Sequence, residues 1–164
     1  MSSNMISRII AAGTAHTNST DEAVLASYTL AGYAFQPGKA YGFSALVQAT
    51  ATNSTDTLAI RIRLGPTTLT GTAMVTSAAV DVADADFYLV EGTLLARDVD
   101  SSSTVWGQGI GGFSTTGESA AVYANSITTL DLTVANLLEL TADWSVASAG
   151  NSCRAERFEV FEIT

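Results

Sequence analysis

Residues 58–64, in the middle of the chain, alternate between large apolar side chains and smaller or charged ones. A period of two is that of a β-strand, in which successive side chains point to opposite faces. The leucine and isoleucine side chains of this run therefore point inward, and Arg61 and Arg63 point outward. Because a helix cannot gather this pattern on one face, the run requires a sheet with one buried face.

The rest of the chain consists of short segments rich in Val, Ile, Leu, Tyr and Phe, separated by clusters of Gly, Asn, Asp and Ser. Such spacing is typical of a β-sandwich or barrel. We predict an all-β fold, an antiparallel, jelly-roll-like β-sandwich over residues 21–164, preceded by an extended N-terminal arm of residues 1–20. The other expected strands are residues 23–33, 41–51, 72–82, 87–96, 104–113, 119–123, 138–146 and 154–163.

Several of these segments support further expectations. Residues 87–96 are apolar on both faces and are expected at the centre of a sheet. Residues 104–113 and 119–123 are rich in Gly and Ser, and we expect them near a loop-lined end of the sandwich. The last segment changes phase between Val160 and Phe161, which predicts either a β-bulge there or a strand that is covered on both sides by its partners.

Composition limits the classes of partner. Hydrophobic residues make up 47% of the 164 residues and charged residues only 14%, so uncharged polar residues must supply much of the solubility. A formal net charge of −9 opposes binding to a phosphate backbone, and we expect no direct nucleic-acid partner. No apolar run reaches the length of about 18 residues that marks a membrane span, and no signal peptide is recognisable at the start. We expect no membrane partner.

Side chains that commonly carry out chemistry are scarce. His16 is the only histidine and lies in the polar part of the arm, and Cys153 is the only cysteine. One histidine and one cysteine cannot supply the ligands of a zinc site, and a catalytic base needs a rigid surround. Cys153 and Trp144 are both expected in the core. We therefore predict no enzyme activity, no catalytic residue, no cofactor and no metal site.

Two patterns could indicate a nucleotide site or a metal site, but neither is complete. Residues 107–112 match GxGxxG, but residues 113–117 cannot open the helix that would hold a pyrophosphate. Aspartates at positions 81, 84, 86, 98 and 100 flank expected turns without the Gly-bearing acidic loop that calcium usually requires, which favours solvated turns. A metal-dependent hydrolase would have to use Asp84 or Asp86.

The arm supplies the first candidates for contact with another protein. An apolar arm can add a strand to the edge of a neighbour's sheet by β-augmentation. Because free chain ends are usually disordered, we expect a neighbouring subunit to hold the arm in place. The arm residues proposed for capsid or subunit contact are Met5, Ile6, Arg8, Ile9 and Ile10.

Arginines and one tryptophan supply the other candidates. Arginine suits bidentate contact with carboxylates across an interface, and the alternative is that these residues are solvated on outer strand faces. The candidates for intersubunit contact are Arg61, Arg63, Arg154 and Arg157. Trp106, near the glycine-rich segment, is the candidate for a ligand-binding tip.

Three runs resemble small virion structural proteins of tailed bacteriophages: residues 22–32, 57–65 and 140–152. The resemblance extends from about Asp21 to the end of the chain. It implies a jelly-roll-type sandwich, commonly trimeric, that serves as a capsid decoration (cement) protein or as a module of a tail or head fibre. It implies no enzyme activity.

Two hypotheses follow from this resemblance. In the first, the chain is a homotrimeric decoration protein, made in the bacterial host cytoplasm, that binds the major capsid protein on the outer capsid surface and stabilises the head. In the alternative, it is a fibre or receptor-binding module that recognises host surface glycan near Trp106.

Overall fold

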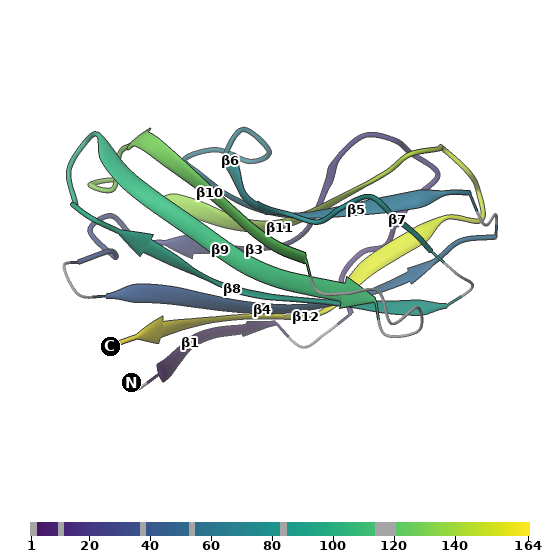
Figure 1. Cartoon of the computed structure of the whole chain (residues 1–164), viewed down its shortest axis with the longest axis horizontal. Coiled ribbons are helices and arrows are strands. Elements are labelled where there is room, and N and C mark those ends of the chain that lie inside the picture. Colours follow the sequence, from purple (N-terminus) through teal and green to yellow (C-terminus); the bar gives the residue numbers. More distant parts are fainter. Residues whose placement is uncertain (1–2, 10–11, 37–38, 53–54, 83–84, 114–120) are drawn as a thin grey trace.

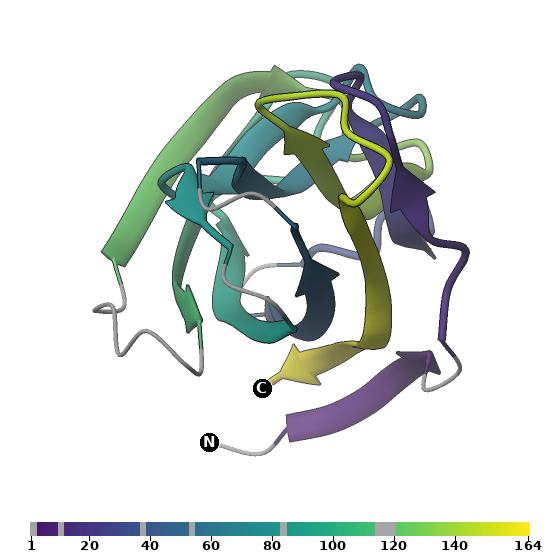
Figure 2. The ribbon, with the colours of Figure 1, turned by 90° about the vertical axis from the view of Figure 1, so that its right-hand side faces the viewer.

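The computed structural model describes residues 3–9, 12–36, 39–52, 55–82, 85–113 and 121–164. All regular secondary structure in these residues is β-strand, arranged in two antiparallel sheets that pack face to face (Figures 1 and 2). The prediction of an all-β antiparallel sandwich is therefore confirmed. Within these ranges no helix is long and apolar enough to cross a membrane.

One sheet has seven strands, in the order β1-β12-β4-β8-β9-β10, with β2 also paired to β12. β8 lies between β4 and β9, which confirms the central position expected for residues 87–96. The strands are β1 (Ser3–Ile9), β2 (His16–Thr17), β4 (Ala40–Thr50), β8 (Asp86–Ala96), β9 (Ser103–Phe113), β10 (Ala121–Leu130) and β12 (Ser152–Ile163).

The second sheet has five strands, in the order β3-β11-β5-β6, with β7 also paired to β5. The expected strand over residues 72–82 is divided into two short ones, β6 and β7, which pair with different parts of β5. The strands are β3 (Ala23–Leu30), β5 (Thr57–Gly65), β6 (Thr72–Thr76), β7 (Val80–Asp81) and β11 (Asn136–Trp144).

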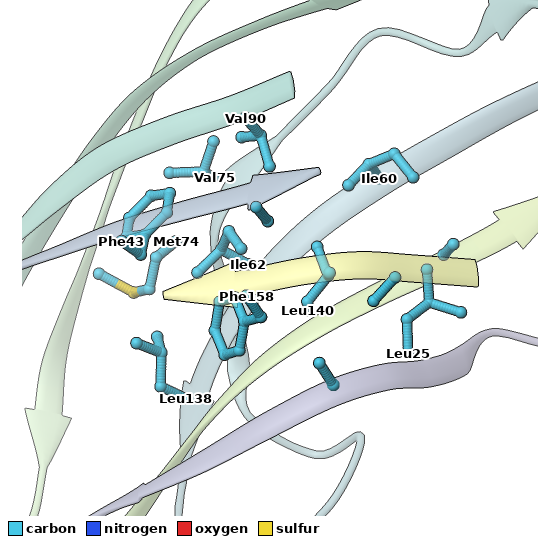
Figure 3. Close-up of a cluster of buried hydrophobic side chains, with 14 of the residues drawn as sticks. Leu25, Phe43, Ile60, Ile62, Met74, Val75, Val90, Leu138, Leu140 and Phe158 are labelled. Atoms are coloured by element: carbon cyan, nitrogen blue, oxygen red, sulfur yellow. The ribbon is translucent and has the colours of Figure 1, made fainter. Parts of the chain in front are cut away.

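The core lies between the sheets and is formed by alternate side chains of each strand (Figure 3). The alternation predicted for β5 is confirmed, since its leucines and isoleucines are at most 2% exposed. Trp144 is 1% exposed, as expected for a core residue. Val146, two residues beyond Trp144, is 46% exposed, because β11 ends at Trp144.

The glycine-rich segments form strands, as predicted. Residues 104–113 lie in β9, and the described part of the second segment belongs to β10, which extends to Leu130 and pairs with β9 in the seven-stranded sheet. Glycine is needed in β9 because β6 of the facing sheet approaches closely. A β-carbon at Gly107 would lie 2.7 Å from Cβ of Met74, and one at Gly109 would lie 3.1 Å from Val75.

The bulge predicted in the last strand exists at a different place. In β12 it lies between Ala155 and Arg157, where the strand shifts register against β4. At Val160 and Phe161 the strand is instead covered on both sides, by β1 and β4, and the register shift there lies in β1, between Met5 and Ser7. The extra residue, Glu156, is needed because Ala155 and Phe158 are both buried in the core, and an unbroken alternation would turn one of them outward.

Candidate functional site

The N-terminal arm forms β1 and pairs antiparallel with β12 of its own chain, whereas the sequence suggested that a neighbouring subunit holds it. β12 would otherwise present a long bare edge on the side away from β4, and β1 covers it. Ile6 and Ile9 pack against the core, and Met5 is 50% exposed. Arg8 Nε lies 2.7 Å from Glu159 Oε1 on β12. Ile10 lies outside the described residues.

Three exposed apolar side chains lie in loops near the end of the sandwich where β11 begins. Tyr33 follows β3, Leu69 lies between β5 and β6, and Val134 precedes β11, with exposed fractions of 60%, 38% and 46%. The last residues of β3 and β5 both pair with the first residues of β11, so these loops adjoin neighbouring strand ends. We call these three residues the apolar tip.

Backbone contacts hold the apolar tip in place. The Tyr33 N–H donates to the Leu132 carbonyl at 2.7 Å, and the Leu132 N–H donates to the Asp100 carbonyl at 2.9 Å. The Leu69 N–H donates to the Glu139 carboxylate at 2.9 Å. Tyr33 and Leu69 have φ values of 61° and 59°, in the left-handed region that is unfavourable for such side chains. Strained backbone of this kind clusters at functional sites.

The arm begins at this same end of the molecule. Ser3 pairs with Ile163, which pairs in turn with Ala40, the first residue of β4. Figure 1 shows both chain ends beside the loop between β3 and β4, the loop that carries Tyr33. The sandwich therefore presents the apolar tip and the start of β1 at one end.

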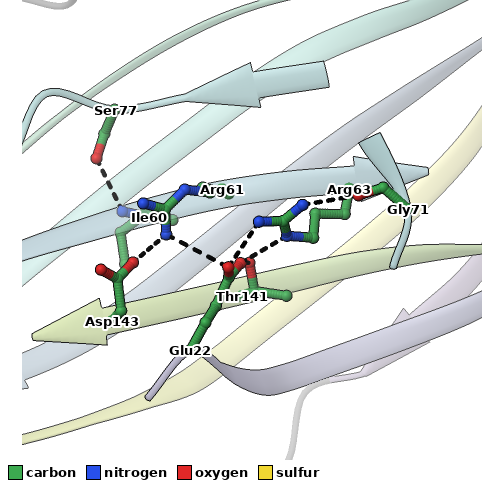
Figure 4. A network of polar contacts seen from close by, with 8 residues as sticks. All are labelled: Glu22, Ile60, Arg61, Arg63, Gly71, Ser77, Thr141 and Asp143. Atoms are coloured by element: carbon green, nitrogen blue, oxygen red, sulfur yellow. Dashed lines mark hydrogen bonds and ion pairs between the residues drawn. The ribbon is translucent and has the colours of Figure 1, made fainter. Parts of the chain in front are cut away.

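Arg61 and Arg63 point outward from β5, as predicted, and are bound within the chain (Figure 4). Arg63 makes a bidentate contact with the Glu22 carboxylate at 2.7 and 2.6 Å, and its Nη1 donates to the Gly71 carbonyl at 2.7 Å. Arg61 pairs with Asp143 of β11. These contacts stabilise the outer face of the five-stranded sheet, and a role between subunits remains a prediction.

Polar residues on the outer face of β11 are covered, since Glu139 is only 2% exposed and Thr141 is fully buried. The loop after β5 covers Glu139 through the Leu69 N–H, and the Thr141 hydroxyl donates to Glu22. Local sequence pattern cannot predict this cover, because Glu22 and Leu69 lie far from β11 along the chain.

The Glu22 carboxyl makes the stability of the fold depend on pH. Burial raises its pKa, but hydrogen bonds from Arg63 and Thr141 and the charges of Arg63 and Arg61 outweigh burial, so the pKa lies below its ordinary value. A carboxyl with a lowered folded-state pKa stabilises the fold above its unfolded pKa of about 4.3, and the contribution disappears as pH falls through the folded-state value.

We expect Glu22→Gln to lower the free energy of unfolding at about pH 7. The difference in free energy between the variant and the wild type should shrink as the pH falls toward about 3. Urea denaturation across this range measures the difference. Glu156→Gln is the control, because its partner Arg154 has a side chain that is 43% exposed, where ion pairs contribute little. A Glu22→Gln effect that stays constant with pH would contradict the account.

Arg154 and Arg157 lie on the outer face of the seven-stranded sheet. Arg154 contacts Glu156 at 2.6 Å and Gln48 at 2.9 Å. The Arg157 Nη2 donates to the Ser44 hydroxyl at 3.0 Å, beside a groove of about 610 Å³ that this arginine helps to line. A role of Arg154 and Arg157 in contact between subunits remains a prediction.

Trp106 lies on the same outer face, in β9, and is half-buried. The Arg97 guanidinium lies 4.8 Å from the centre of its ring, a cation–π contact that occupies one face of the indole. Trp106 pairs with Leu95, which is 48% exposed. Only part of the indole is therefore available for stacking on a ligand.

Among the described residues, no group of three or more His, Cys, Asp or Glu side chains is placed to hold a metal ion. Asp98 and Asp100 instead cap a turn, accepting hydrogen bonds from the N–H groups of Thr104 and Ser102 at 2.9 and 2.6 Å. Asp84 lies outside the described residues. The surfaces described above are suited to binding.

His16 and Cys153 are register partners in β2 and β12, yet the thiol is only 1% exposed. Burial raises the pKa of Cys153 to about 12, which opposes formation of a reactive thiolate. We expect the folded protein to resist a thiol-labelling disulfide reagent at about pH 8 and to react once guanidinium unfolds it. Absorbance measures the rate of labelling. Rapid labelling of the folded protein would show that the Cys153 thiol is accessible and would contradict its burial.

No protein-family model and no curated protein matches this chain. Among solved structures, lectin I from Ulex europaeus, crystallised in complex with the methyl glycoside of α-L-fucose, is similar to it. The sequence identity is 9%, the similarity covers 76% of this chain and 71% of that chain, and the TM-score is 0.34. A similarity of this size carries no inference about function.

Proposed function

We propose that the chain is a virion structural protein of a tailed bacteriophage, a homotrimeric decoration (cement) protein that binds the major capsid protein on the outer capsid surface. In this role it stabilises the head and catalyses no reaction. Two features support the proposal: the sequence resemblance to small phage virion proteins, and the apolar tip at one end of the sandwich.

The apolar tip carries the proposal. Large apolar side chains left exposed on neighbouring loops are candidates for contact with a partner, and aromatic anchors buried on binding supply much of the energy of an interface. Tyr33 is 60% exposed and Leu69 38%, and both are held in unfavourable backbone conformations. A contact function accounts for this arrangement, because the cost is offset when the tip is buried against a partner.

The edge strands add a second line of support. β10 lies at one edge of the seven-stranded sheet (Figure 2). A hydrogen bond from Asn125 Nδ2 to the Ala73 carbonyl, at 2.8 Å, connects it to β6 of the facing sheet. At the other edge, β1 pairs only with β12 among the described strands. Its outer side is therefore suited to β-augmentation by a capsid or neighbouring-subunit strand.

Trimer symmetry and net charge fit the same role. A trimer can bind a symmetric capsid site through three apolar tips at once. Once one tip is bound, the other two are at high effective concentration, so the affinity of the trimer exceeds that of a single weak contact. A net charge of −9 on each chain keeps decorated particles apart through repulsion.

The experiment mixes undecorated phage capsids with three versions of the purified protein and measures binding by co-sedimentation. Deleting residues 1–19 removes the arm and is expected to abolish binding. Met5→Glu keeps β1 but places a charge at the exposed position 5, and it is also expected to abolish binding. Circular dichroism checks that each variant is folded. Full capsid binding by both folded variants would contradict the role of the arm.

A second candidate is a fibre module that recognises host surface glycan, and the partly exposed indole of Trp106 favours it. Under this candidate, Trp106→Ala abolishes binding to host cells, whereas deletion of residues 1–19 leaves it unchanged. Under the decoration role the same two variants give the opposite pattern on capsids.

A further inference from the structure

The groove on the outer face of the seven-stranded sheet follows β4. The small Ser44 side chain of β4 forms part of its floor, whereas Gly42, two residues earlier on the same face, lies under the Phe161 ring. Longer side chains from β12 on one side and from β8 and β9 on the other form its walls. Its volume of about 610 Å³ lies within the range of small-molecule sites.

Apolar surface lies on both sides of this floor. A β-carbon at Gly42 would collide with the ring of Phe161, so the glycine allows that ring to lie over the strand. Ile110, on the β9 side, is 46% exposed. The Phe161 ring and the Ile110 side chain both line the groove and supply its apolar surface.

Hydrogen bonds and ion pairs within the chain fix the polar groups at the centre of the groove in the absence of a ligand. The Ser44 hydroxyl donates to Glu91 Oε1 at 3.0 Å and accepts from Arg157 Nη2 at 3.0 Å. Arg157 Nε lies 3.6 Å from Glu159 Oε2 and has no hydrogen-bond acceptor among the described residues. Charged groups fixed in this way lose little conformational entropy when they bind.

The charges around the groove identify the class of ligand. Glu159 is paired with Arg8 at 2.7 Å and lies near Arg157, while Glu91 is bonded to a neutral serine. The groove is therefore close to neutral, with a slight acidic excess, in a chain of net charge −9. An anionic ligand is disfavoured, and the wall offers both carboxylate acceptors and arginine and glutamine donors.

We infer that this groove binds a neutral saccharide. Neighbouring hydroxyls of a sugar donate to the Glu91 and Glu159 carboxylates and accept from Arg157, while an apolar C–H face of the sugar packs on the Phe161 ring. The inference does not depend on the decoration role, because the groove lies on the side of the sandwich and the apolar tip lies at its end.

The test is an NMR titration of the full ¹⁵N-labelled chain with maltotriose, cellotriose, chitotriose and mannotriose. Trilysine and sialyllactose serve as the cationic and anionic comparisons. At least one neutral trisaccharide, at about 10 mM, is expected to shift amide resonances of β4, β8 and β12 to saturation, since this concentration exceeds even a weak Kd of about 1 mM.

Three variants assign the binding to the groove. Glu91→Gln removes one charged acceptor and Ser44→Leu fills the floor, and each is expected to weaken binding by about tenfold or more. Glu156→Gln, on the same strand as Arg157 but outside the groove, is expected to leave affinity unchanged. Failure of all four neutral sugars, unchanged binding to Ser44→Leu, or binding of trilysine or sialyllactose alone would each overturn the inference.

Discussion

The double variant Tyr33→Asn, Val134→Asn is expected to lose capsid binding by about 100-fold or more while remaining at least as stable as the wild type. Anchor side chains of an interface commonly contribute about 2 kcal/mol each to binding, so removing two of them has an effect of this size. Asparagine tolerates the left-handed backbone of position 33 better than tyrosine does, so the fold does not suffer.

The combination of lost binding and retained stability distinguishes a contact role from a structural one. Leu89→Asn, Val146→Asn is the matched control, because these residues are 40% and 46% exposed and lie away from the tip. Co-sedimentation with capsids measures binding, and chemical denaturation measures stability. Equal loss of binding in both double variants, or no loss in either, would show that the tip is not the contact surface.

Replacing Gly92 by alanine is expected to lower the free energy of unfolding by about 3 kcal/mol or more, a larger effect than any other single change proposed for stability. Gly92 lies in β8, the central strand of its sheet. A β-carbon there would lie 2.8 Å from Cα of Gly109 and would overlap the Gln108 carbonyl oxygen and the Phe43 ring. Backbone atoms of β9 cannot move away without breaking the sheet.

Thr93→Ala is the control for this prediction, because it changes the next residue of the same strand on the opposite, partly exposed face. Its expected cost is below about 1 kcal/mol. Urea denaturation monitored by tryptophan fluorescence gives both values. A cost for Gly92→Ala as small as that of the threonine variant would mean that β4, β8 and β9 are not packed as described.

The sequence predicted those parts of the fold that depend on local pattern. The alternation in β5 fixed which side chains are buried, and the same rule placed Trp144 in the core. The bulge in β12 was placed wrongly, because its position depends on which residues the facing sheet buries. The glycine-rich strand β9 was predicted, but the reason for its glycines was not, since they make room for β6 of the other sheet.

The candidate sites were much harder to predict. The apolar tip combines three residues from three loops, and the partners of Arg61 and Arg63 come from other strands. One signal was present for the groove. In β4, small residues such as Gly42 and Ser44 alternate with the large core residues Tyr41 and Phe43, which indicates a low outer face. The depth of the groove depends on neighbouring strands that the alternation does not identify.

The most direct test of the decoration role is to add the purified protein to undecorated phage capsids and count the bound copies by electron microscopy. The account predicts saturable binding in threes at symmetry-related positions of the outer surface, with decorated capsids resisting heat better than bare ones. Absence of binding, or binding without saturation or symmetry, would contradict the account and make the fibre module the leading candidate.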